Sequence, residues 1–196
     1  MKKALQTLPD GYTQIFEVDL QKSKKMAIIL NVLAVAIAIA MAVPVAFIVP
    51  FFDLFDMSQG LLMYALRFLA LILGLVAYII LHELTHGIAM KICGSKKIKY
   101  GFTLLYAFAG SDDYYSKGSY IFIALAPVVL WGVILGIICP FLPPAWFWVV
   151  YIIQITNIAG AAGDFYVTAK FSRFPADILV QDSGVGMKVY SQTKNR

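Results

Sequence analysis

Two histidines and a glutamate stand together in one short stretch of the sequence, His82-Glu83-Leu84-Thr85-His86, and the chain has no other histidine. Four residues apart on a helix, both imidazoles project from one face about a turn apart, so they can bind a single tetrahedral metal ion. Glu83 follows the first histidine, where a carboxylate can accept a proton from water without itself binding the metal. The stretch therefore predicts a catalytic zinc site, and a polar contact between helices with no metal is the structural alternative.

A catalytic zinc ion usually has a third protein ligand, and Asp164 is the best candidate. Lys91 lies nine residues after His82, roughly 13 Å along a helix, and Lys170 lies six residues after Asp164, roughly 9 Å. Because the two lysines end their apolar segments, His82 and Asp164 are expected at a similar depth below the same face of the membrane. A purely structural role for Asp164 stays open.

Asn157 and two further aspartates are weaker candidates for the site. Asn157 lies seven residues before Asp164, so on a regular helix both face the same way. Its amide could donate a hydrogen bond to a tetrahedral oxyanion or to the substrate backbone, and a hydrogen bond between helices explains it as well. Asp112 and Asp113 are rival third ligands, although a solvated loop is the commoner place for such a pair.

The elements that must position these residues are long and apolar. Apolar residues make up 61% of the 196 residues and charged residues 14%, whereas soluble domains carry roughly 25% charge. A soluble core of this size cannot bury so much apolar surface, which favours lipid as the solvent. Four segments are long enough to cross a bilayer: residues 26–52, 61–90, 119–142 and 145–169. We predict an all-α transmembrane fold with four spanning helices and a polar segment, containing a hairpin, between the second and third.

The positive charges predict how the spans are oriented. Five lysines or arginines lie in each of three polar segments, residues 1–25, 91–117 and 170–196, and Arg67 is the sixteenth. Four spans place these segments on one face, which the positive-inside rule makes cytoplasmic. We expect a multi-pass cell-membrane protein with both termini in the cytoplasm, in contact with lipid and not with nucleic acid. Arg67 is expected to snorkel to the opposite interface.

The same segments define the expected domains: a cytoplasmic N-terminal segment at 1–25, a four-span membrane domain at 26–170 and a cytoplasmic tail at 171–196. In the first segment Phe16, Val18 and Leu20 alternate with acidic residues, which predicts a short strand. Residues 98–109 are apolar but too short to cross as a helix, so we expect a hairpin that lies against the helices. The polar tail is expected to be disordered or loosely packed.

Several of these motifs together resemble known families. The group of intramembrane site-two proteases carries the same histidine motif on one membrane helix and an asparagine and an Asp-Gly pair on a later helix, with the aspartate as third zinc ligand. The matching parts here are 82–86, Gly94, the aromatic stretch to Phe108, 120–127 and 157–164. Phe165 stands where that group has the glycine, and Gly160 where a proline is common. The whole chain, including Leu8-Pro9-Asp10-Gly11-Tyr12 and the basic residues 22–25, is similar to the bacterial family of putative zincin peptidases.

The resemblance implies a zinc-dependent endopeptidase with His82, His86 and Asp164 as ligands and Glu83 as general base. The expected cofactor is zinc, and the expected substrate is a membrane protein or a membrane-associated peptide. Residues 98–109 could offer an edge strand that holds an unwound substrate extended, and an interfacial loop explains them equally well. The alternative function is a membrane protein that binds or transports metal without catalysis, or an inactive scaffold, because polar groups midway along helices also suit ion pathways.

Overall fold

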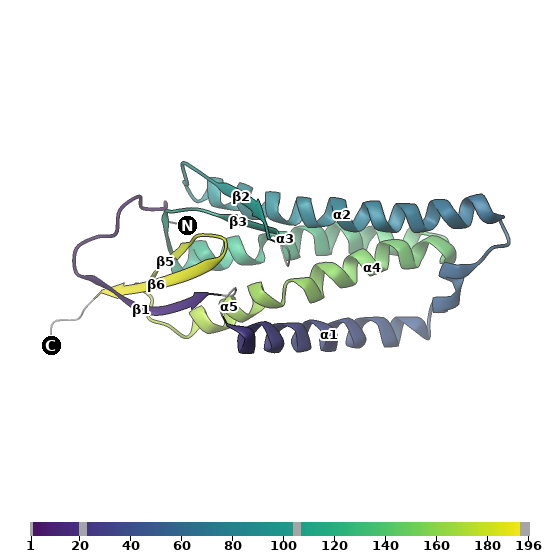
Figure 1. The fold of residues 1–196 in the computed structure, drawn as a ribbon, viewed down its shortest axis with the longest axis horizontal. Helices are drawn as coiled ribbons and strands as arrows, with labels where there is room; N and C mark the ends of the chain where they lie inside the picture. Colours follow the sequence, from purple (N-terminus) through teal and green to yellow (C-terminus); the bar gives the residue numbers. More distant parts are fainter. Residues whose placement is uncertain (1, 20–22, 104–106, 193–196) are drawn as a thin grey trace. The chain divides into compact units, whose positions relative to one another are not determined.

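The computed structural model describes residues 2–19, 23–103 and 107–192. Within these ranges the chain is mostly helical and carries two small sheets (Figure 1). Leu20, Lys22 and the tip of the expected hairpin at 104–106 lie outside the described residues. The elements follow in the order β1 Tyr12–Asp19, α1 Lys24–Ala46, η1 Phe51–Phe55, α2 Leu61–Ile92, β2 Lys99–Phe102, β3 Ala107–Gly110, β4 Tyr114–Ser116, α3 Lys117–Ile138, η2 Cys139–Phe141, α4 Pro144–Gly160, α5 Ala162–Ser172, β5 Leu179–Asp182 and β6 Gly186–Gln192.

Four stretches of helix in the described chain are long and apolar enough to cross a membrane: Lys24–Ala46, Leu61–Ile92, Lys117–Phe141 and Pro144–Ser172. They overlap the four predicted spans, although the first ends at Ala46 and not at residue 52, so the predicted transmembrane helical fold is confirmed. Pro44 and Pro127 lie within α1 and α3, and membrane helices tolerate proline where neighbouring groups satisfy the freed carbonyls. Pro144 lies in the first turn of α4, where the missing N–H has no helical partner to lose.

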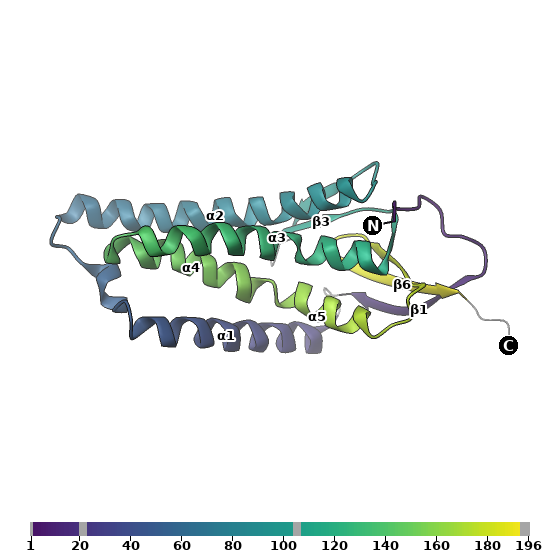
Figure 2. The same cartoon turned by 180° about the vertical axis from the view of Figure 1, so that it is seen from behind.

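The chain divides into two compact units. The first comprises residues 1–29, 83–126 and 163–196, and the second comprises residues 30–82 and 127–162. In the second unit, α4 packs closely on α2 and α3 (Figure 2). A Cβ on Gly74 of α2 would lie 2.6 Å from Cδ1 of Ile153, and one on Gly132 of α3 would lie 3.3 Å from Nδ2 of Asn157. Small residues therefore allow the helices of this unit to approach one another.

Arg67 is fully buried in the second unit, with 0% of its surface exposed. Its guanidinium donates hydrogen bonds to the backbone carbonyls of Leu54 and Asp56, both at 2.9 Å, and of Asp53 at 3.2 Å. These carbonyls belong to η1 and the residue after it, and the end of a short helix leaves carbonyls that need donors. The side chain therefore closes η1 in the loop between α1 and α2, and the snorkelling of Arg67 to the opposite interface stays a prediction.

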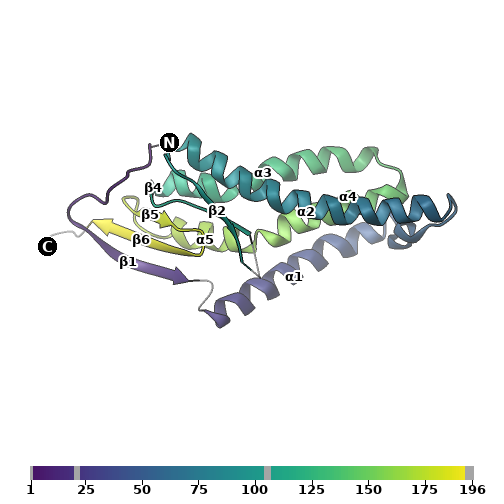
Figure 3. The same ribbon diagram turned by 45° about the horizontal axis from the view of Figure 1, so that its top comes forward.

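The first unit is built on a four-stranded antiparallel sheet with the strand order β1-β6-β5-β4 (Figure 3). The strand predicted from alternating residues near the N-terminus is β1. Tyr115, Val180 and Val189 from this sheet and Phe171 from α5 are each 0% exposed and share one hydrophobic core. The sheet and the adjoining helix ends therefore stabilise each other through buried apolar surface.

The C-terminal segment is ordered into this sheet, contrary to the expectation of a loosely packed tail. β6 pairs with β1 on one side and with β5 on the other, so the tail supplies the two inner strands. Met187 and Val189 are buried and Lys188 between them is exposed, which is the alternation of a strand with one face in the core. The alternation is present in the sequence of β6, but β1, the strand with which β6 pairs, lies near the opposite end of the chain.

The predicted hairpin is present as β2 and β3, paired antiparallel from Lys99 opposite Gly110 to Phe102 opposite Ala107. It lies against α2, because a Cβ on Gly87 would collide with the ring of Tyr100 in β2. Gly87 follows His86 directly in the sequence. The absence of a side chain at Gly87 therefore lets the hairpin approach the helix that carries the histidines.

The fourth span is interrupted at Ala161, whose ψ of 17° is not helical. α4 ends at Gly160 and α5 begins at Ala162. The expectation that Asn157 and Asp164 share a face required a regular helix, and the interruption removes that reason. Asp164 lies instead in the first turn of α5, where the helix dipole interacts favourably with a carboxylate.

Candidate metal centre

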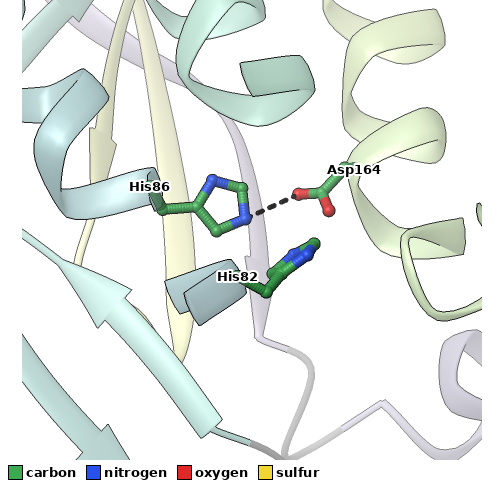
Figure 4. A group of neighbouring side chains, drawn as sticks. All are labelled: His82, His86 and Asp164. Atoms are coloured by element: carbon green, nitrogen blue, oxygen red, sulfur yellow. Dashed lines mark ion pairs between the residues drawn. The ribbon is translucent and has the colours of Figure 1, made fainter. Parts of the chain in front are cut away.

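Three side chains that can bind metal converge in the structure: His82 and His86 from α2 and Asp164 from α5 (Figure 4). One ligand atom from each lies within 4.8 Å of the other two. Nε2 of His86 is 3.6 Å from Oδ1 of Asp164, the pair joined by the dashed line. All three side chains are partly buried. The structure therefore brings together the three residues that the sequence nominated as ligands.

The orientation of His86 follows from a backbone contact. Its Nδ1 lies 2.9 Å from the carbonyl oxygen of Ile123 in α3, and a carbonyl can only accept a hydrogen bond. Nδ1 must therefore carry the proton, which leaves the lone pair of the neutral imidazole on Nε2, the nitrogen that faces Asp164. A backbone carbonyl that fixes the tautomer in this way is the usual support of a histidine that binds metal.

His82 is held from its other side by side chains. The hydroxyl of Tyr78, one turn earlier on α2, lies 2.8 Å from Nδ1 of His82 and 2.8 Å from Oδ1 of Asn157. Nδ2 of Asn157 donates to the carbonyl of Val128 at 3.2 Å. Asn157 is thus engaged with Tyr78 and with α3, and a contact of its amide with a substrate stays a prediction.

Glu83 lies beside the metal group and is not one of its members. Its side chain is half-buried, and the backbone N–H of Ala109 in β3 donates a hydrogen bond to its carboxylate. The carboxylate also interacts electrostatically with His86 and Asp164. Glu83 is therefore next to the candidate ligands and in contact with the hairpin.

Asp182, at the end of β5, is a carboxylate close to this site that sequence reasoning missed. Tyr120 donates a hydrogen bond to Oδ2 of Asp182 at 2.6 Å, and the backbone N–H of Gly184 donates to Oδ1 at 2.8 Å. Burial raises the pKa of Asp182, although the hydrogen bonds from Tyr120 and Gly184 and the nearby His86 oppose the shift. No spacing rule links β5 to a motif on α2, so the sequence offered no signal for this carboxylate.

The rival third ligands have other partners. Both carboxylate oxygens of Asp112 accept hydrogen bonds from Nζ of Lys99, at 2.6 and 2.8 Å, on an exposed surface. Asp113 is buried, and its carboxylate accepts a hydrogen bond from the backbone N–H of Lys96. Among the described residues, neither aspartate belongs to the group formed by the two histidines and Asp164.

The donor set of the metal group suits zinc. Two imidazole nitrogens and one carboxylate are the ligands of many catalytic zinc sites, which keep a fourth position for water or substrate. A neutral histidine binds metal through the ring nitrogen that carries the lone pair, and in His86 this nitrogen is Nε2, which faces Asp164. His82, His86 and Asp164 are the residues that would hold the ion.

Comparisons with known proteins add a family to this geometry. The profile of a family described as putative zincin peptidase matches residues 75–179, a range that includes the motif of α2 and Asp164. The chain is also similar to an uncharacterized 24.7 kDa protein of Pyrococcus woesei, with 30% identity over 128 residues that cover 60% of this chain and 53% of that protein. The chain thus spans about half the length of this curated relative. No solved structure matches it.

Proposed function

This chain belongs to the putative zincin peptidase family, and from that premise we propose that it is an intramembrane zinc metalloendopeptidase that hydrolyses peptide bonds of membrane-associated substrates. The observation that carries the proposal is the convergence of two imidazoles and a carboxylate within 4.8 Å, with Glu83 adjacent to His82 in α2. The four apolar helices support a reaction that takes place in a membrane.

The metal supplies what side chains alone cannot. Zinc, when bound by His82, His86 and Asp164, supplies a Lewis acid that polarises the peptide carbonyl and makes water more acidic. His86 keeps its Nε2 turned toward Asp164 because its other ring nitrogen is engaged by the carbonyl of Ile123. Partial burial of the group keeps the local dielectric constant low, which strengthens every electrostatic interaction there.

Glu83 is the general base and then the general acid. It accepts a proton from water while the water oxygen forms a bond to the carbonyl carbon of the substrate. It returns that proton to the amide nitrogen as the C–N bond breaks, so that the amine leaves with the hydrogen it needs. The hydrogen bond from Ala109 fixes the position of the Glu83 carboxylate during both transfers.

The hairpin provides a place for an extended substrate. A helical peptide hides its carbonyls in hydrogen bonds, so the segment that is cut has to unwind. β2 and β3 form a sheet of two strands, and a peptide that adds to the outer edge of such a sheet is held extended by its own backbone. The edge of β3 lies beside Glu83, since Ala109 donates to that carboxylate.

The proposal includes an orientation in the membrane. With lysines and arginines concentrated in residues 1–25, 91–117 and 170–196, we infer that both termini and the sheet of the first unit lie in the cytoplasm. His86, Glu83 and Asp164 belong to the same compact unit as this sheet. Water therefore has its shorter route to the site from the cytoplasmic side.

The test is the substitution Glu83→Gln in the purified protein and in cells. The variant is expected to retain one zinc ion per chain, because Glu83 is not a ligand. It should lose at least a factor of about 100 in peptide cleavage, since removing a general base costs on the order of 10²–10⁴ in rate. Zinc is measured by elemental analysis, and cleavage by profiling new N-termini in membranes of cells that express either form.

Asp112→Asn is the matched control, because it removes an exposed carboxylate whose partner is Lys99. This control should keep both zinc and cleavage. Full zinc content together with unchanged N-termini in Glu83→Gln cells would refute the peptidase and leave a membrane protein that binds metal without catalysis.

A further inference from the structure

The two histidines of the metal group are supported in different ways. Nδ1 of His86 contacts a backbone carbonyl, whereas Nδ1 of His82 contacts the hydroxyl of Tyr78 at 2.8 Å. That hydroxyl contacts Oδ1 of Asn157 at 2.8 Å, and Nδ2 of Asn157 contacts the carbonyl of Val128 at 3.2 Å. Tyr78 is 6% exposed and Asn157 is 0% exposed. A buried chain of hydrogen bonds therefore runs from the backbone of α3 to the ring of His82.

The carbonyl of Val128, at the α3 end of this series of hydrogen bonds, fixes the direction of every hydrogen bond in the series. The carbonyl of Val128 can only accept, so the amide nitrogen of Asn157 faces it and the amide oxygen faces Tyr78. That oxygen can also only accept, so the single proton of the Tyr78 hydroxyl points to Asn157. The hydroxyl oxygen then offers lone pairs to His82, and Nδ1 of His82 must be the donor.

A second contact fixes the same orientation of Asn157. Nε2 of Gln154 donates to the carbonyl of Gly132 at 3.1 Å, so Oε1 of Gln154 is the atom turned toward Nδ2 of Asn157, at 3.5 Å. An Asn157 amide rotated by 180° would place its oxygen against the acceptors of Val128 and Gln154. Two backbone carbonyls of α3 thus anchor one orientation of the asparagine.

We propose that Tyr78 and Asn157 are positioning residues that hold His82 as the tautomer with its proton on Nδ1 and its lone pair on Nε2. This inference rests on the proposed function, because the tautomer matters for binding the metal. Asn157 acts on the site through Tyr78 and His82, two hydrogen bonds away from the imidazole ring. Partners of this kind typically change metal affinity by 10–100-fold when they are removed.

The inference predicts an unusual pattern among substitutions. Tyr78→Phe removes the hydroxyl that accepts from Nδ1 of His82, so this support of the tautomer is lost, and zinc affinity should fall about 10-fold. Asn157→Leu frees the hydroxyl of Tyr78 to donate to Nδ1, which favours the tautomer with the proton on Nε2, so affinity should fall further. The double variant combines Tyr78→Phe with Asn157→Leu and so lacks the hydroxyl that would donate to Nδ1. Its zinc affinity should return to the value of Tyr78→Phe alone.

The experiment measures zinc affinity of the purified full chain by competition with a chelator, and the visible spectrum of the Co²⁺ form as a report on the ligands. Tyr151→Phe is the matched control, because its hydroxyl donates to the carbonyl of Met41 at 3.0 Å and has no part in the chain to His82. Tyr151→Phe should bind zinc like the wild type and should leave the Co²⁺ spectrum unchanged.

The outcomes separate this inference from the proposed function. Wild-type protein without zinc overturns the proposed function and the inference with it. Zinc in the wild type, with equal affinity in Tyr78→Phe and Tyr151→Phe, overturns the inference alone. Losses that add in the double variant also overturn it, because additive losses indicate packing defects. If Asn157→Leu does not fold, the comparison of Tyr78→Phe with Tyr151→Phe decides by itself.

Discussion

At the scale of single residues, the site depends on what each ligand touches behind its metal-binding atom. His86 has a backbone carbonyl at its second ring nitrogen, so no single side-chain change can remove that support. His82 has the hydroxyl of Tyr78 there, which makes it the ligand that substitutions can perturb. Asp164 lies at the start of a new helix, where backbone N–H groups favour a negative charge.

Removal of a ligand is the direct test of this set. His86→Ala and Asp164→Asn should each reduce bound zinc from about one ion per chain to near zero after dialysis, because a site of three protein ligands left with two binds weakly. Elemental analysis of the purified variants measures this. Asp113→Asn replaces a buried carboxylate outside the group and should keep its zinc. Full zinc in Asp164→Asn would show that another residue is the third ligand.

The motif at residues 82–86 could be recognised from the sequence, whereas the groups that contact its histidines from other elements could not. His82, Glu83 and His86 could be assigned because helical spacing alone places both imidazoles on one face. Asp164 needed an argument from depth, which used the helical rise from Asp164 to Lys170 and so did not depend on the interruption at Ala161. Asp182 comes from a strand in the C-terminal segment, and no local spacing connects it to α2.

At the scale of elements, the helices and the strands differ in what a sequence reveals. The four spans are runs of apolar residues that are long enough to cross a bilayer, and the structure has them at the predicted places. The hairpin β2–β3 and strand β1 also follow from local alternation. β5 and β6 alternate too, but a strand is stable only beside its partners, and β6 needs β1 from the opposite end of the chain.

Adjacent positions of β6 test whether the C-terminal strands are part of the folded unit. Val189→Asp places a charge where the side chain is 0% exposed and should destabilise the protein by about 3 kcal/mol, because an uncompensated charge in a core costs several kcal/mol. Lys188→Asp changes the exposed neighbour and should cost less than about 0.5 kcal/mol. Thermal unfolding in detergent measures both. Equal unfolding temperatures for the two variants would place β6 outside the stable fold.

At the scale of the whole molecule, the arrangement of charge predicts which segments face the cytoplasm. The loop at 53–60 has no lysine or arginine, whereas the segments 1–25, 91–117 and 170–196, which contain the strands of the four-stranded sheet, carry five each. A positive charge near a span is retained on the cytoplasmic side during insertion. The expected topology therefore has η1 on one side of the membrane and β1, β5 and β6 on the other.

Cysteine labelling in intact cells checks this topology. Gln59→Cys and Lys188→Cys introduce thiols at exposed positions in a chain whose own cysteines, Cys93 and Cys139, are replaced by alanine. A maleimide that cannot cross the membrane should label position 59 in intact cells and position 188 only after permeabilisation. The opposite pattern would invert the proposed orientation, although the four spans would stand.

The pairing of β1 with β6 has a consequence for how the protein is made. Among the described elements, β1 is synthesised before α1, and β6 is synthesised after α5. With translation at about 5–20 residues per second, α2 is synthesised seconds before β6 can pair with β1. Asp164 and β6 both follow the histidines in the chain, so neither the third candidate ligand nor the closed sheet is available when α2 has just been made.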